Sequence, residues 1–95
     1  MPTFVRLPRF DRDWASLDPL ARARFREAVA RFVEDLRDGS SRPGLRVKGV
    51  AGAPGVFELT WAPDGRATFS YGRDQGRGAH IIWRRIGTHD VLRRP

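Results

Sequence analysis

The sequence contains no cysteine, and this absence excludes several kinds of protein. A chain without thiols cannot form a disulfide framework, a thiolate nucleophile or a cysteine-based zinc site. It also has no apolar run near the ~18 residues that a membrane-spanning helix needs, and no signal peptide is recognisable in its first residues. We therefore expect one domain over residues 1–95, stabilised by packing alone, with a cytoplasmic location and no contact with a membrane.

Lysine and histidine are also scarce, because Lys48 is the only lysine and the histidines are His80 and His89. Basic residues still outnumber acidic ones by 18 to 11, which gives a net charge of +7 carried almost entirely by arginine. A GC-rich genome favours arginine codons, but a guanidinium also matches phosphate and stacks on bases. Such a charge on a short chain favours nucleic acid, an acidic protein, or both as partners.

The sequence offers little that would hold a metal ion or a cofactor. Two histidines without a local carboxylate cluster do not make a metal site. The glycine-rich segment 49–55 is not followed by the Gly-Lys-Ser/Thr of a phosphate-binding loop, and it is better interpreted as a flexible connection. We therefore predict no metal and no cofactor.

Hydrophobic periodicity predicts two helices in the first half of the chain. After a short expected strand over 3–7, apolar residues at i, i+4 and i+7 indicate a short helix over 10–17. Asp18 then supplies an N-cap, and a proline follows at the first helical position of a longer helix over 19–38. Gly39 stands where a left-handed residue commonly ends a helix.

The second half of the chain has the texture of strands. Segment 45–48 is a weak extended candidate, and 56–61 and 66–71 are better strands joined by an Asp-Gly turn. A last strand is expected over 80–86. The predicted fold class is therefore α+β, with a short N-terminal strand, two helices and an antiparallel sheet of three or four strands.

The faces of this sheet bear on function. In the last strand we place Ile81 and Trp83 on one face and Ile82 and Ile86 on the other. We expect Trp83 to be buried and leave Trp61 undecided between the core and the surface. Two helices can cover one face only, so the other face is open and lined by arginines of the strands.

His89 is the residue best suited to proton transfer. It follows the last predicted strand in the sequence Gly87-Thr88-His89-Asp90, where an exposed imidazole can be aimed at a substrate and held by Thr88 or Asp90. A plain polar turn is the alternative interpretation of these residues. His80 begins a strand, and we give it a supporting role only.

The cations in this half of the chain match the needs of RNA cleavage. Cleavage without a metal requires a base for the 2′-hydroxyl, cations for the phosphorane and an acid for the leaving 5′-oxygen, and arginine and histidine can supply all three. Each arginine is individually also typical of a solvent-facing residue. Trp61 could stack on a base. The candidate RNA-binding residues are Lys48, Arg46, Arg84, Arg73, Arg77, His80 and Trp61.

Four segments resemble the RelE/ParE toxin superfamily. Residues 10–17 resemble its first helix, 45–49 its Leu-Lys-Gly segment, and 65–71 its strand of an arginine, apolar residues and a tyrosine. The most specific segment is 85–92, which resembles the Arg-x-Gly-Thr-His-x-x-Leu close of the YafQ-like branch of mRNA interferases. Together these segments cover nearly the whole chain in the expected order.

This resemblance implies a βααβββ fold, ribosome-dependent cleavage of mRNA, and neutralisation by an acidic cognate antitoxin. It implies that His89 is the catalytic acid or base and that Arg66 is the catalytic cation that stabilises the phosphate. Arg85 would take part in catalysis as a supporting charge, as would Lys48. No cofactor is implied.

Two alternatives remain open because the chain differs from the family pattern. It lacks the terminal tyrosine of other RelE branches and has no clear match for the histidines that the YafQ branch carries near mid-chain. The first alternative is a ParE-like, non-enzymatic inhibitor of DNA gyrase. The second is an inactive relative that binds nucleic acid or protein.

Overall fold

Strands and helices alternate once along the chain, in an α+β arrangement that confirms the predicted class. The computed structural model describes residues 2–73, 76 and 78–95. Their elements are β1 (Thr3–Arg6), α1 (Pro8–Ala15), α2 (Pro19–Asp38), the 3-10 helix η1 (Pro43–Leu45), β2 (Lys48–Gly49), β3 (Phe57–Thr60), β4 (Gly65–Tyr71), β5 (His80–Thr88) and the 3-10 helix η2 (His89–Arg93).

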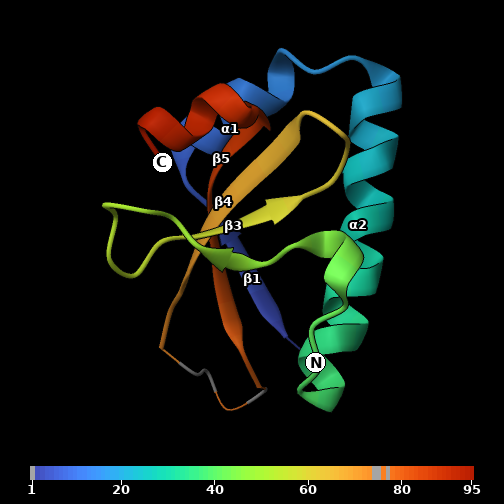
Figure 1. Ribbon diagram of the computed structural model, residues 1–95, viewed down its shortest axis with the longest axis vertical. Helices are drawn as coiled ribbons and strands as arrows, with labels where there is room; N and C mark the ends of the chain where they lie inside the picture. The colour runs from blue at the N-terminus through green and yellow to red at the C-terminus, as the bar shows by residue number, and fades with distance from the viewer. Residues whose placement is uncertain (1, 74–75, 77) are drawn as a thin grey trace.

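The strands form one sheet of order β1-β5-β4-β3-β2, in which β1 runs parallel to β5 and the other pairs are antiparallel. The long connection from β1 to its parallel partner β5 contains both α-helices and then the strands β2, β3 and β4. Figure 1 shows α2 along one side of the sheet and α1 beside η2 at one end. The sheet is therefore mixed and five-stranded, one or two strands larger than expected.

The predicted ends of α2 are confirmed. The Asp18 side chain accepts a hydrogen bond from the Ala21 backbone N–H at 2.8 Å, and Pro19 occupies the first turn. Gly39 ends the helix with φ 72°. This capping fixes where the helix starts and stops, and so fixes which residues face the sheet.

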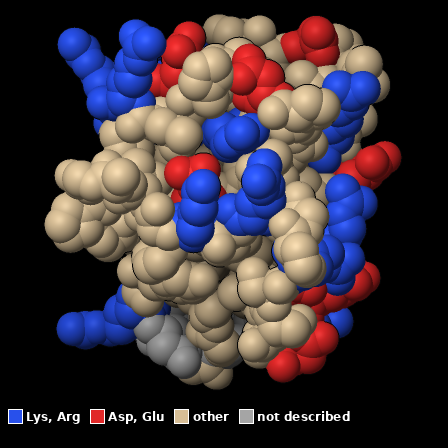
Figure 2. Space-filling model, in the orientation of Figure 1, with Lys and Arg blue, Asp and Glu red and all other residues tan. Residues whose placement is uncertain are grey.

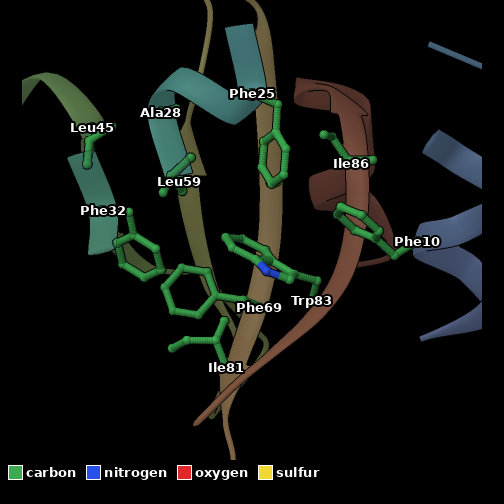
Figure 3. Close-up of a cluster of buried hydrophobic side chains, with 11 residues drawn as sticks. Phe10, Phe25, Ala28, Phe32, Leu45, Leu59, Phe69, Ile81, Trp83 and Ile86 are labelled. Atoms are coloured by element: carbon green, nitrogen blue, oxygen red, sulfur yellow. The ribbon is translucent and has the colours of Figure 1, made fainter. Parts of the chain in front are cut away.

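An aromatic cluster fills the space between α2 and the sheet (Figure 3). Trp83 of β5 lies at its centre, 5.2 Å from the Phe25 ring and 5.5 Å from the Phe69 ring, in edge-to-face geometry. Trp83 is 4% exposed, so its predicted burial is confirmed. Buried aromatic pairs of this kind contribute about 0.5–1.5 kcal/mol each beyond the area that they bury.

Two sequence expectations for the strands were wrong. Residues 45–48 are not extended: Leu45 ends η1, Arg46 has φ 50° and only Lys48 enters β2. The second error concerns Ile86, which is buried on the same face as Trp83. A register shift in the β4–β5 pair opposite Thr68 inserts one extra residue, which reverses the alternation.

The sheet face opposite α2 is only partly open. Its residues include Glu58, Arg66 and Thr68, which alternate with buried residues of the core face. The chain after η2 crosses this face, because Thr68 Oγ1 donates to Pro95 O at 3.2 Å. Arginines do line the face, as predicted, but part of it is covered. None of the helices in the described ranges has the length and hydropathy needed to cross a bilayer.

Candidate functional site

The β3–β4 turn and the C-terminal end of β5 meet at one end of the inner strands of the sheet. Gly65 pairs with Thr88 and Arg66 pairs with Gly87, so the strand register places the residue after Thr88 beside the turn. That residue is His89, the first of η2. The sheet therefore brings the predicted catalytic histidine next to Asp64, a residue that sequence reasoning had assigned to the turn alone.

The imidazole of His89 is held by a carboxylate. Its Nδ1 lies 2.5 Å from Asp64 Oδ1, whereas its Nε2 lies 3.8 Å from Asp90 Oδ1. The hydrogen bond with His89 is the main reason that the pKa of Asp64 is lowered, and the charges of His89 and Arg66 add to this effect. An ionised Asp64 accepts a hydrogen bond from the Nδ1–H of His89 and leaves Nε2 to meet a substrate. Both side chains are more than half exposed, so the pair is accessible.

The two residues expected to hold the imidazole have other roles. Thr88 caps η2, because its Oγ1 accepts a hydrogen bond from the Asp90 backbone N–H at 3.3 Å. Asp90 is too far from Nε2 for a hydrogen bond. The partner of His89 comes from 25 residues earlier in the chain. Only the cross-strand register, which the sequence does not state, reveals it.

Arg66 of β4 directly follows the β3–β4 turn that carries Asp64. Its Nη1 donates to the carbonyl oxygens of Pro63 and Gly65 at 3.3 and 3.0 Å, and its Nε lies 3.9 Å from Glu58 Oε1. These contacts fix the guanidinium and leave Nη2 without a hydrogen-bond partner among the described residues. Arg66 is thus held beside the turn, with one guanidinium nitrogen that no described residue binds.

Glu58 is a buried carboxylate that sequence reasoning did not single out. Its side chain is 9% exposed, and it pairs across the sheet with Lys48 on one side and Thr68 on the other. The alternation of β3 places Glu58 on the sheet face opposite α2, next to β4, the strand that carries Arg66. Glu58 is therefore a buried carboxylate beside the Arg66 guanidinium.

Arg85, the expected supporting charge, is engaged in contacts within the protein. Its Nε and Nη2 donate to the Asp13 carboxylate at 2.6 and 3.2 Å, and its Nη1 donates to Arg94 O at 3.2 Å. Asp13 also accepts the Ile86 backbone N–H. The guanidinium of Arg85 is thus committed to tying α1 to β5, and this geometry supports a structural role.

Arg84 is likewise engaged within the protein, because its Nε donates to Pro95 O at 3.1 Å. His80 bonds through Nδ1 to Thr3 Oγ1 at 2.7 Å, which links β5 to β1. Neither residue is part of the cluster around His89. Arg73 is exposed in the loop after β4, away from the turn, and Arg77 lies outside the described residues.

Lys48 is exposed on β2, an edge strand of the sheet, and Arg46 is exposed just before that strand. Trp61 is half-buried between the β3–β4 turn and α2, where its ring meets Phe25 edge-on at 6.5 Å. The ring also packs against Gly65 of the turn. No group of three or more metal-ligating side chains occurs among the described residues.

The fold of the chain can be compared with known proteins. No protein-family model and no curated protein matches the chain. Solved structures do match over nearly their whole length. The RelE toxin in the RelB-RelE complex of Methanococcus jannaschii is 16% identical with a TM-score of 0.64, over 94% of each chain. This chain has a RelE-like toxin fold.

Two further structures agree. The match in the E. coli DinJ-YafQ toxin-antitoxin complex is 14% identical, with a TM-score of 0.64 over 96% of each chain. A copper-bound mutant toxin from Helicobacter pylori is 17% identical, with a TM-score of 0.65 over 97% of this chain and 99% of that one. At these identities the RelE-like fold is shared, and function has to be argued from the site.

Proposed function

We propose that this chain is the toxin of a toxin-antitoxin system and that it cleaves mRNA without a metal. The observation that carries the proposal is the His89–Asp64 pair, whose Nδ1 and Oδ1 atoms lie 2.5 Å apart near Arg66. This pair is accessible at one end of the inner strands of a RelE-like sheet. Solved proteins of this fold are named as toxins, two of them in complexes with antitoxins. The net charge of +7 suits an RNA substrate.

Under this proposal each group that the reaction needs is assigned to one of these residues. Glu58 accepts the proton of the 2′-hydroxyl, whose oxygen then bonds to phosphorus, and Arg66 neutralises the phosphorane. The phosphorus–O5′ bond breaks, and the protonated imidazole of His89 gives its Nε2 proton to the leaving oxygen. The products are a 2′,3′-cyclic phosphate and a 5′-hydroxyl end. Asp64 orients the ring throughout.

The partners follow from the same surface. A basic toxin is expected to bind an acidic antitoxin over its cationic face, since complementary charge speeds association and selects the partner. Ribosome dependence forms part of the proposal through the family resemblance. A short acidic protein encoded by the neighbouring reading frame would support the proposed antitoxin partner.

Expression in a bacterial host tests the proposal. The wild-type chain should arrest growth and leave transcripts with 5′-hydroxyl ends, and His89→Gln should do neither. A DNA-damage response without cut transcripts would favour a gyrase inhibitor of the ParE kind. Arrest that persists unchanged in His89→Gln would argue against the chemistry assigned to this residue.

A further inference from the structure

A basic pocket lies between α2, the η1 loop and the β3–β4 turn. Its volume is about 380 Å³, and its charged lining residues are Arg31 of α2 and Arg42 and Arg46 on either side of η1. No carboxylate is among its described lining residues. In Figure 1 this loop passes in front of α2, and Figure 2 shows basic side chains over that region.

The three guanidinium groups differ in what they already bind. Arg42 is neutralised, because its Nε and Nη2 contact the Asp35 carboxylate at 3.0 Å and its Nη2 also meets Glu34 at 3.0 Å. This contact fixes the η1 loop against the end of α2. The guanidinium groups of Arg31 and Arg46 make no ion pair or hydrogen bond within the described ranges, and only the backbone N–H of Arg46 donates, to Pro43 O. These two guanidinium groups are therefore available to an anion that enters the pocket.

The pocket adjoins the candidate active site. Its lining residues Trp61, Ala62 and Pro63 also line a second groove of about 510 Å³, which continues to Asp64 and Thr88. One stretch of the β3–β4 turn therefore separates the pair of free arginines from the His89–Asp64 pair. A polyanion that reaches the active site meets the pocket on the other side of the turn.

We propose that this pocket binds a phosphodiester of single-stranded RNA, at a nucleotide away from the bond that is cut. The proposal rests on the proposed function, since it takes RNA as the substrate. Guanidinium groups bind carboxylates as well as phosphates, but the pocket shares the β3–β4 turn with Asp64, and this closeness to the His89–Asp64 pair favours the RNA strand over an acidic peptide.

Binding of an RNA that cannot be cut provides the test. A 2′-O-methyl oligonucleotide of about ten nucleotides lacks the attacking hydroxyl and is long enough to cross a small single-strand-binding surface. Arg31→Gln and Arg46→Gln should each raise its Kd about fivefold and lower the salt slope by about 0.7. Arg12→Gln makes the same charge change on an exposed position of α1 and should leave both quantities unchanged.

Gly44 offers a matched pair of probes for the pocket. A Cβ added there meets nothing within 4 Å, so a side chain can be placed at the rim without a clash. Gly44→Glu should weaken binding by repelling phosphate, whereas Gly44→Gln, of nearly the same shape, should bind as the wild type does. Equal binding by these two variants would contradict the proposal.

The outcomes separate the pocket from the catalysis. If Arg31→Gln and Arg46→Gln bind the oligonucleotide as Arg12→Gln does, or weaken only the binding of a polyglutamate peptide, the pocket is not an RNA site. A wild-type chain that does not bind the oligonucleotide overturns the pocket as well. If the pocket variants lose RNA binding while the wild type fails to cut RNA, the pocket stands and the proposed cleavage fails.

Discussion

Gly65 is the position at which a single methyl group tests the construction of the site. A Cβ on this residue would lie 2.6, 2.7 and 2.9 Å from three ring atoms of Trp61, whereas carbon atoms in contact normally stay about 3.5–4.0 Å apart. Gly65→Ala therefore forces the indole to move by roughly 1 Å. The ring cannot move freely, because its other contacts include Phe25 of α2.

Overpacking of this kind costs about 1–3 kcal/mol, which for a domain of this size lowers Tm by about 5–20 °C. Thermal and urea denaturation followed by tryptophan fluorescence measure the effect. Gly44→Ala is the control, because its new methyl group faces open space. If Gly65→Ala is as stable as Gly44→Ala, the indole does not pack on the turn as described, and the placement of Asp64 next to it is also in error.

Three further predictions concern the ion pairs. Arg85→Met should lower the free energy of unfolding by about 2 kcal/mol in urea denaturation, because Asp13 is left without its bidentate partner; unchanged stability would contradict the structural role of Arg85. Asp64→Asn should reduce RNA cleavage by about tenfold to a hundredfold with little effect on Tm, less than the loss of an acid or base itself; full activity would mean that Asp64 does not orient the ring. The hydrogen bonds from Arg42 hold the pKa of Asp35 below its usual value. This carboxylate therefore stabilises the fold above about pH 4, and the stabilisation is lost as the pH falls through the lowered pKa. Asp35→Asn should be less stable than the wild type at neutral pH, and its stability should vary less with pH in acid.

Local signals predicted the ends of α2, whereas α1 (Pro8–Ala15) begins and ends two residues before the predicted 10–17. The cap at Asp18, the proline at the first helical position and the left-handed glycine at position 39 are chemical requirements of helix ends, and they can be recognised in a few residues. The Asp-Gly turn and the strands on either side of it were equally local. The α+β class followed from these elements alone.

The errors arose where distant parts of the chain act on each other. The bulge opposite Thr68 depends on how β4 and β5 pair, and it moved Ile86 to the core face. The ion pair of Arg85 with Asp13 was not predicted either, because it joins residues 72 positions apart. A strand arginine looks the same in a sequence whether it faces solvent or a helix.

The candidate site was predicted in part for the same reason. His89 and Arg66 were named from the sequence because histidine and arginine have recognisable chemistry at those positions. Asp64 was hidden in a turn signature, and Glu58 in the alternation of a strand. Both become candidates once the register of the hairpin and of the last strand is known.

The most direct measurement of the proposed chemistry is the mapping of RNA ends after brief expression of the wild-type chain and of His89→Gln in the same host. Wild-type protein should produce cut transcripts that end in a 5′-hydroxyl and a 2′,3′-cyclic phosphate, and His89→Gln, folded to the same Tm, should produce about 10²–10⁴-fold fewer. Intact transcripts in arrested wild-type cells, or equal cutting by both proteins, would contradict the assignment of this chain as a His89-dependent ribonuclease.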